Sequence, residues 1–394
     1  MSITAPLGFR AAAVLAGIKP DRLDLALVVA DGPCPAAGVF TTNRSQAAPV
    51  LISREHLQSG LARAVVVNAG CANAATGERG LADAREMALL SATALGCRAQ
   101  EVLVASTGVI GVHLPMDKIR AAIPAAAAAL SRDAAKDAAR AIMTTDTKPK
   151  EVTVEFEVAG KPARIGGMAK GAGKIAPNMA TLLAFFTTDA TVPQAVLRRA
   201  LLEAVGDGLN RITVDGDTST NDMAVVLASG AAETAEVAGQ GRDYEAFRDA
   251  LTQASRALAE MIVRDGEGAS RIAEIRVEGA RSAAEADRVA RTIAESPLVK
   301  TALHGGDPNW GRILAAAGRS GVEIDPDRVG IWIGEVWVSE KGQARAYNED
   351  LAHAAMMADP VRIRVDLGQG SGFGWMWTCD LTHGYVDINA HYRS

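Results

Sequence analysis

The chain has 394 residues, a length that predicts two or three domains with a large core. Its formal net charge is −5, from 41 basic and 46 acidic residues, so no excess of positive charge points to nucleic acid. No apolar run approaches the length of a membrane span, and Met1–Arg10 lacks a signal-peptide core. Four scattered cysteines show no metal-ligand spacing and suggest no disulfide framework, so we expect a reducing compartment, the cytoplasm.

The N-terminal part of the chain predicts short strands followed by a helix. Strands are expected at Leu25–Val29 and Gly38–Phe40, separated by a turn at Asp31–Pro35. A third strand is expected at Ala64–Asn68, and helical periodicity follows at Leu81–Cys97.

The next stretch combines a glycine-punctuated turn with polar residues. Glu101–Gly111 predicts a strand that ends in a turn, which suits either close packing or the presentation of a hydroxyl and a backbone N–H to an oxyanion. Residues 119–143 are alanine-rich and helical, with an interruption expected near Pro124. The hydroxyls, acid and lysines of Thr144–Lys150 suit amino-acid recognition, or simply a solvated turn.

The central stretch runs from Lys170 to Asp189. A glycine-rich loop with two cations is followed by an extended link through Pro177 and then by an apolar run, Leu182–Phe186, typical of a buried strand. Thr181 stands where the link meets this strand. Its hydroxyl could attack the preceding carbonyl and cut the chain, which would expose an α-amine with a pKa of roughly 7.7–8.0, suited to serve as the base. By residue type alone, an ordinary threonine at a strand start is the favoured interpretation, because threonine is common at strand ends.

The glycines of this loop could also suggest phosphate binding. A phosphate-binding loop requires Ser or Thr after its lysine and a glycine five residues before its last glycine, but these positions hold Ile175 and Met168. Pro177 also disfavours the helix that such a loop should enter. We therefore disfavour a phosphate site.

The segment after the central stretch predicts a helix at Val192–Asn210, an acid- and hydroxyl-rich turn at Ile212–Asp222 and a strand at Met223–Ala228. The turn lacks the glutamate that a calcium-binding EF-hand needs at its twelfth position, where Val226 stands. An amphipathic helix, Tyr244–Val263, then ends near Glu267, which two glycines flank. Those glycines would let the backbone aim the Glu267 carboxylate, or they mark an exposed helix end.

The C-terminal part predicts a mixture of strands and helices. A helix is expected to begin at Asp307-Pro308, as N-cap and first helical residue. The other expected elements are the strands Ile272–Val277, Val329–Ile333, Val361–Val365 and Phe373–Cys379 and the helices Ala283–Glu295 and Glu349–Met357.

The run from Lys170 to Thr181 closely resembles the cleavage and nucleophile motif of the ornithine acetyltransferase (glutamate N-acetyltransferase) family. Further similar stretches, among them Val39–Asn43 and Ser296–Arg312, extend the resemblance from Gly8 to Ser394. It implies a layered α/β fold with outer helices, like that of the DmpA-type aminopeptidases. A catalytic domain, 1–270, would contain the cut, and 271–394 would form a smaller α+β domain.

The resemblance also implies roles for individual residues. Thr181 would be the nucleophile, and cleavage after Ala180 would give chains 1–180 and 181–394, associated as a heterotetramer with two copies of each. Thr107 and Gly108 would form the oxyanion hole. The substrate-binding residues would be Thr147, Lys170, Thr181, Glu267, Asn389 and Ser394, the last replacing the family's usual terminal threonine.

The expected activity is transfer of acetyl from N2-acetyl-L-ornithine to L-glutamate, without metal or cofactor; acetyl-CoA as an additional donor stays open. A self-processing aminopeptidase would use the same threonine chemistry but release free amino acids. A ligand-binding protein without activity would remain uncut.

Overall fold

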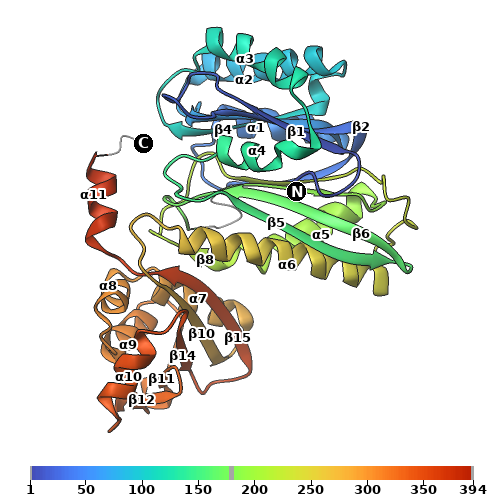
Figure 1. The fold of residues 1–394 in the computed structure, drawn as a ribbon. Helices are drawn as coiled ribbons and strands as arrows, with labels where there is room; N and C mark the ends of the chain where they lie inside the picture. Colours follow the sequence, from blue (N-terminus) through green and yellow to red (C-terminus); the bar gives the residue numbers. More distant parts are fainter. Residues whose placement is uncertain (1, 177–181, 392–394) are drawn as a thin grey trace. The chain divides into compact units, whose positions relative to one another are not determined.

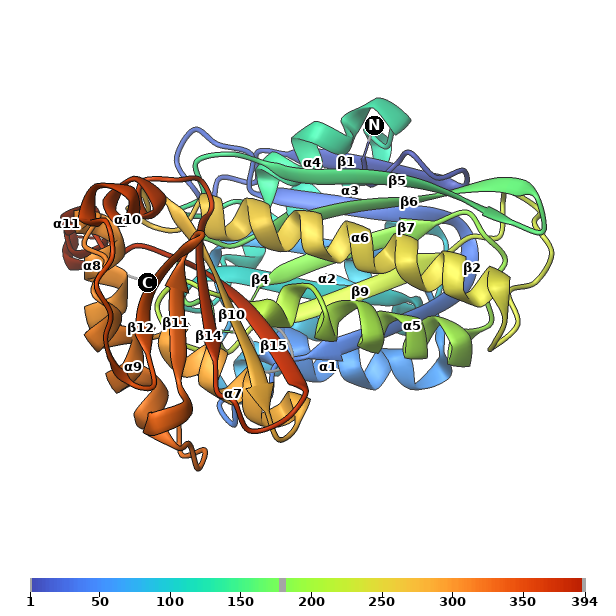
Figure 2. The same cartoon turned by 90° about the horizontal axis from the view of Figure 1, so that it is seen from below.

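The computed structural model describes residues 2–176 and 182–391, which form two compact units (Figures 1 and 2). The first unit comprises residues 1–210 and 217–262, and the second comprises 211–216 and 263–393. Ala180, Thr181 and Ser394 lie outside the described residues. The predicted layered α/β architecture is confirmed, because both units consist of a sheet and covering helices.

In the described part of the first unit, one eight-stranded sheet has the order β4-β3-β2-β9-β7-β6-β5, with β1 paired to β2. Most of its ladders are antiparallel, but β3 runs parallel to β4 and β7 parallel to β9. The strands are β1 (Phe9–Val14), β2 (Leu25–Phe40), β3 (Leu61–Cys71), β4 (Val102–Val109), β5 (Lys150–Val158), β6 (Lys161–Lys170), β7 (Leu183–Thr188) and β9 (Met223–Ala228).

Strand β2 joins the two halves of this sheet. Its first part pairs with β1 and β3, and its last part, Ala36–Phe40, pairs with β9. The predicted turn at Asp31–Pro35 is therefore wrong, because the strand continues through it. The turn-forming residues instead occupy an irregularity where the register with β3 shifts between Val29 and Cys34, and Asp31 to Pro33 are exposed there.

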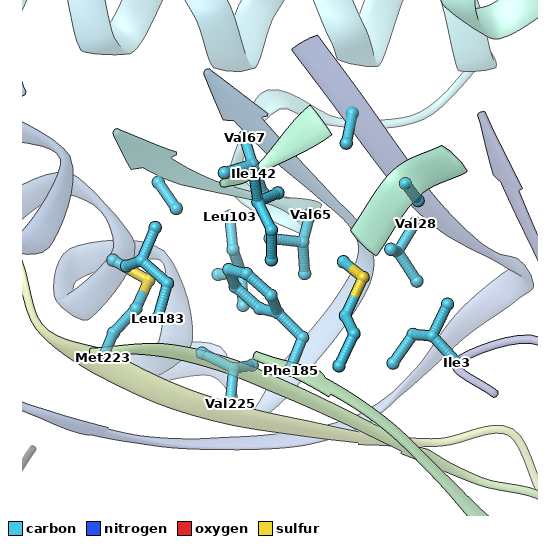
Figure 3. Close-up of a cluster of buried hydrophobic side chains, with 14 of the residues drawn as sticks. Ile3, Val28, Val65, Val67, Leu103, Ile142, Leu183, Phe185, Met223 and Val225 are labelled. Atoms are coloured by element: carbon cyan, nitrogen blue, oxygen red, sulfur yellow. The ribbon is translucent and has the colours of Figure 1, made fainter. Parts of the chain in front are cut away.

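The two halves of the sheet pack face to face through an apolar core (Figure 3). Val28, Val65 and Leu103 come from one half, and Phe185 and Val225 come from the other. Because successive side chains of a strand point to opposite faces, the alternate residues of β2 and β3 contribute to a second core with α2 and α3. The site described below lies where strands of both halves end.

Helices cover the outer faces of the first unit. The long ones are α2 (Gly77–Leu95), α3 (Met116–Ala128), α5 (Gln194–Gly206) and α6 (Arg242–Arg264), and α1 (Ala48–His56) is shorter. Helix α4 (Ala135–Ala141) instead packs its alanines into the core between the two halves of the sheet. The predicted interruption at Pro124 is wrong, since α3 continues through this proline and ends at Ala128. The carbonyl that loses its helical partner belongs to exposed Arg120, where water can replace the missing N–H.

In the second unit, seven strands form one sheet in the order β13-β12-β11-β14-β10-β15-β8 within the described residues. They are β8 (Ile212–Thr213), β10 (Ile272–Ala280), β11 (Gly330–Ile333), β12 (Val336–Glu340), β13 (Gln343–Ala344), β14 (Val361–Asp366) and β15 (Gly372–Cys379). Residues 211–216 belong to this unit because β8 pairs with β15.

The helices of the second unit are α7 (Ala283–Ala294), α8 (Pro297–Gly305), α9 (Trp310–Gly318), α10 (Glu349–Met356) and α11 (His383–His391). The predicted helix start at Asp307-Pro308 is wrong, because α9 begins at Trp310. Asn309 is its N-cap, and the Asn309 side chain accepts a hydrogen bond from the N–H of Arg312 at 3.1 Å. None of the described helices combines the length and the apolar character needed to cross a bilayer.

Replacing Phe185 by Ala should destabilise the first unit by about 3–5 kcal/mol, because its buried ring fills the core between the two halves of the sheet. All five tryptophans lie in the second unit. Urea unfolding followed by circular dichroism should therefore show a transition at a lower urea concentration. Tryptophan fluorescence follows the unfolding of the second unit. Phe373→Ala, at an exposed position, is the control. An unchanged circular-dichroism midpoint for Phe185→Ala would contradict the packing described.

Candidate active site

Strand ends from both halves of the sheet converge on one small cavity. Thr107 comes from the end of β4, Lys170 is the last residue of β6, and Asp222 immediately precedes β9. The cavity has a volume of about 30 Å³, room for a water molecule. Its lining consists of Thr107, Lys170, Gly171, Gly173, Lys174, Ile175, Leu182, Leu183, Ser219, Asn221 and Asp222. Leu182 directly follows Thr181 in the sequence, so the cavity adjoins the predicted nucleophile along the chain.

The predicted oxyanion pair, Thr107 and Gly108, lies at an irregularity of the β3–β4 ladder. Gly108 has φ +132°, and a Cβ there would come 2.3 Å from the carbonyl carbon of Gly70, so only glycine fits. The Thr107 hydroxyl accepts a long hydrogen bond of 3.4 Å from the Lys170 ammonium. Its own proton can therefore point elsewhere, as an oxyanion donor requires.

Asn221 ties the turn before β9 to the chain segments around Thr107. Its Nδ2 donates to the carbonyl of Ser106 at 2.8 Å and to that of Ala72 at 2.6 Å. One buried amide thus fixes the turn that carries Asp222 relative to the turn that carries Thr107. The sequence predicted an acid- and hydroxyl-rich turn at Ile212–Asp222 but gave Asn221 no role.

Asp146 is the charged centre of the predicted substrate-binding turn, Thr144–Lys150. Its buried carboxylate accepts hydrogen bonds from the Lys150 ammonium and the Gly171 N–H, both at 2.7 Å, and from the Thr144 N–H at 3.0 Å. Burial by itself acts to raise the pKa of Asp146, but the positive charges of Lys170 and Lys150 outweigh it and hold this pKa well below its usual range. Asp146 therefore stays ionised and fixes the first residue of the glycine-rich loop.

Lys19 is a further cation of this region that the sequence reasoning missed. The carboxylate of Asp24 accepts backbone N–H groups from Ala16, Ile18 and Lys19, which fixes the loop between β1 and β2. The Lys19 ammonium donates to the carbonyl of Met143 at 2.8 Å. Burial lowers the pKa of Lys19 to about 8, although the charge of Asp24 opposes this. No local pattern could have identified it, because its partners are distant in sequence.

The other predicted substrate ligands are not all gathered at the cavity. Thr147 is exposed in the turn next to Asp146 and does not line the cavity. Glu267 and Asn389 lie together in the second unit, where the Asn389 amide donates to the Glu267 carboxylate at 2.8 Å. Glu267 is buried, whereas Asn389 is exposed on α11.

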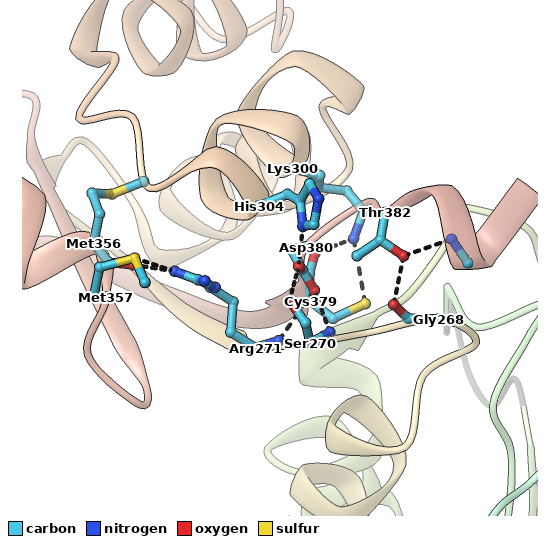
Figure 4. Close-up of polar contacts among 11 residues, drawn as sticks. Gly268, Ser270, Arg271, Lys300, His304, Met356, Met357, Cys379, Asp380 and Thr382 are labelled. Atoms are coloured by element: carbon cyan, nitrogen blue, oxygen red, sulfur yellow. Dashed lines mark hydrogen bonds and ion pairs between the residues drawn. The ribbon is translucent and has the colours of Figure 1, made fainter.

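Polar contacts within the second unit hold the loop that carries Glu267 (Figure 4). The Asp380 carboxylate accepts the Ser270 N–H at 2.8 Å and the Ser270 hydroxyl at 2.5 Å, and His304 Nδ1 lies 3.2 Å from it. The Thr382 hydroxyl donates to the Gly268 carbonyl at 2.6 Å. These contacts fix the residues that follow Glu267, and Thr382 directly precedes α11. Within the described residues, no group of three or more His, Cys, Asp and Glu side chains is arranged to hold a metal ion.

Comparison with known proteins gives consistent matches over the whole chain. The ArgJ family profile matches residues 10–394. Two relatives named arginine biosynthesis bifunctional protein ArgJ, from Symbiobacterium thermophilum and Dehalococcoides mccartyi, are each 50% identical over the full chain and are covered to 98% and 97% of their own lengths. The crystal structure of the Bacillus halodurans protein of that name is 46% identical with a TM-score of 0.52, covering 53% of this chain and 98% of that one.

Asp146→Asn should destabilise the first unit by about 3–5 kcal/mol at pH 7, because it removes the carboxylate that pairs with the buried Lys150 ammonium. The carboxylate has a lowered pKa in the folded chain, so its stabilising effect is complete above the unfolded pKa of about 3.9 and is lost as the pH falls below that. The difference from the natural chain should thus shrink in urea titrations below about pH 4. Asp133→Asn, at an exposed position, is the control, and a pH-independent difference would contradict the assignment.

Proposed function

Because the chain belongs to the ArgJ family of arginine biosynthesis, we propose that it transfers the acetyl group of N2-acetyl-L-ornithine to L-glutamate through an acetyl ester on Thr181. The observation that carries the proposal is the cavity where Thr107, Lys170 and Leu182 meet. It combines a hydroxyl donor, a cation and the residue that follows the nucleophile.

The nucleophile becomes competent when the chain cuts itself. The Thr181 hydroxyl attacks the carbonyl of Ala180, the acyl group moves from nitrogen to oxygen, and water hydrolyses the resulting ester. Thr181 then carries a free α-amine beside its hydroxyl. The fixed ends of the cut segment support this step, since the Ala176 carbonyl accepts from the Thr218 hydroxyl at 3.2 Å and the Leu182 carbonyl accepts from the Met223 N–H at 3.0 Å.

Acetyl transfer then proceeds in two half-reactions. The Thr181 hydroxyl attacks the acetyl carbonyl while the α-amine takes its proton and passes it to the departing nitrogen of ornithine. The Thr107 hydroxyl and the Gly108 N–H stabilise the oxyanion, and the nearby Lys170 ammonium adds positive charge. The amine of glutamate next attacks the ester, which gives N-acetylglutamate and restores Thr181.

Substrate recognition follows from charge. Lys170 suits a substrate carboxylate, and Glu267, oriented by Asn389, suits the side-chain ammonium of ornithine. Thr147 and Ser394 complete the proposed set. We further propose acetyl-CoA as a second donor, because the relatives are named bifunctional. The same proposal includes a heterotetramer of two copies of each fragment and a location in the cytoplasm.

The intact mass of the denatured protein tests the central step. Two species that match residues 1–180 and 181–394 are expected, and Thr181→Ala should give one full-length species without acetyl transfer, because it lacks the attacking hydroxyl. Normal cutting of Thr181→Ala would refute the mechanism. Release of free amino acids from peptides without acetyl transfer would favour an aminopeptidase, and an uncut natural chain would favour a ligand-binding protein.

Glu267→Gln should raise the KM for N2-acetylornithine about 10- to 100-fold, since a charge-assisted hydrogen bond contributes about 1.5–3 kcal/mol. The amide still accepts a hydrogen bond from Asn389, and cutting of the chain should be unchanged. Steady-state kinetics at varied donor concentration measure the effect, with the exposed Glu323→Gln as control. A fall in kcat at unchanged KM would contradict a role in donor binding.

A further inference from the structure

Asp222 is a buried acid with an unsatisfied oxygen at the cavity. Its side chain is 2% exposed, and within residues 2–176 and 182–391 its Oδ2 has no hydrogen-bond partner. Leaving such an atom unpaired costs about 1–3 kcal/mol, so folding alone does not favour the arrangement. None of the roles proposed above uses this carboxyl group.

The surroundings of Asp222 disfavour its ionised form. Burial raises the pKa of this carboxyl well above its usual range, and the hydrogen bond with Ser219 and the positive charge of Lys170 oppose the rise only in part. Lys174 is the other charged side chain that lines the same cavity. Lys170 also interacts with the ionised Asp146. Asp222 therefore keeps its proton to a higher pH than an ordinary carboxyl group does.

The strand register places Asp222 near Leu182, the first described residue after the proposed cut. β9 runs parallel to β7 with Met223 opposite Leu183, and the Met223 N–H donates to the Leu182 carbonyl at 3.0 Å. Asp222 and Leu182 are the residues immediately before these two strands, and both line the cavity. Leu182 is the residue that follows Thr181.

We propose that Asp222 is the proton donor of the self-cleavage step, a role that rests on the proposed cut between Ala180 and Thr181. An amide nitrogen is a poor leaving group until it is protonated. As the Thr181 oxygen bonds to the Ala180 carbonyl carbon and the C–N bond breaks, the nitrogen takes the Asp222 proton. The proton of the Thr181 hydroxyl returns to the Asp222 carboxylate, so the rearrangement has no net proton change, and water then hydrolyses the ester. The Lys170 ammonium stabilises the transient carboxylate.

Cell-free synthesis of the full chain, with the cut fraction followed over time, tests this role. Asp222→Asn matches the size and charge of the protonated acid but has no acidic proton, so cutting should slow at least ~100-fold, the scale of general acid catalysis. Cutting of Asp222→Asn at the natural rate would overturn the proposal, because the amide can replace the carboxyl group in a structural role but not as a proton donor.

The pH dependence of the natural chain gives a second readout that needs no variant. Its cutting rate should fall as the pH rises through the raised pKa of Asp222, because the donor is lost, whereas activation of a hydroxyl alone would make the rate rise. A rate that increases throughout the alkaline range would overturn the proposal even if Asp222→Asn failed to fold.

A matched control and the nucleophile variant distinguish the proposed role of Asp222 from the self-cleavage mechanism itself. Asp83 is also buried and has a raised pKa, and among the described residues its Oδ2 accepts no hydrogen bond. It lies on α2 and does not line the cavity, so Asp83→Asn should be cut at the natural rate. If Thr181→Ala stays whole while Asp222→Asn is cut normally, only the role of Asp222 fails. If Thr181→Ala is cut, the self-cleavage mechanism fails.

Discussion

The packing of the two halves of the first sheet against each other is the constraint on which the site depends. β4 belongs to one half, and β6 and β9 belong to the other, so Thr107, Lys170 and Asp222 meet only because β2 passes between the halves and the core of Figure 3 holds them together. Burial of apolar side chains between the two halves therefore sets the geometry of the cavity. Polar contacts then refine it, since Asn221 ties the turn before β9 to the segments around Thr107.

Two buried carboxyl groups near one lysine show how environment decides charge. Asp146 accepts three hydrogen bonds and has two ammonium groups near it, which keeps it ionised. Asp222 has less compensation for its burial, and its pKa is raised. The same residue type thus supplies a fixed anion that anchors the glycine-rich loop and an acid that can give up a proton. Lys170 interacts with both.

Periodicity in the sequence was enough to predict elements such as β7, β9 and α6, which have strong apolar patterns. The turn-forming residues at Asp31–Pro35 and the helix breaker Pro124 gave wrong predictions. Strand pairing overrode the first signal, and a helix that tolerates proline overrode the second. Periodicity did not predict α11, which has no buried residues and hence no apolar stripe. Thr107 and Lys170 were selected by resemblance, and the structure brings them together. The charge states of Asp146, Asp222 and Lys19 depend on burial by distant segments, which no local pattern encodes.

The ladders of the first sheet cross the proposed cut. β6 precedes it and β7 follows it, and the same is true of β2 and β9, yet each pair is hydrogen-bonded. Cutting would thus leave two polypeptides that share one sheet and one core. Refolding, which is unimolecular for the intact chain, would become a second-order reaction between fragments and would slow on dilution. The mature protein would then stay folded because it unfolds slowly and not because it refolds readily. Folding before the cut would be its only efficient route to the native state.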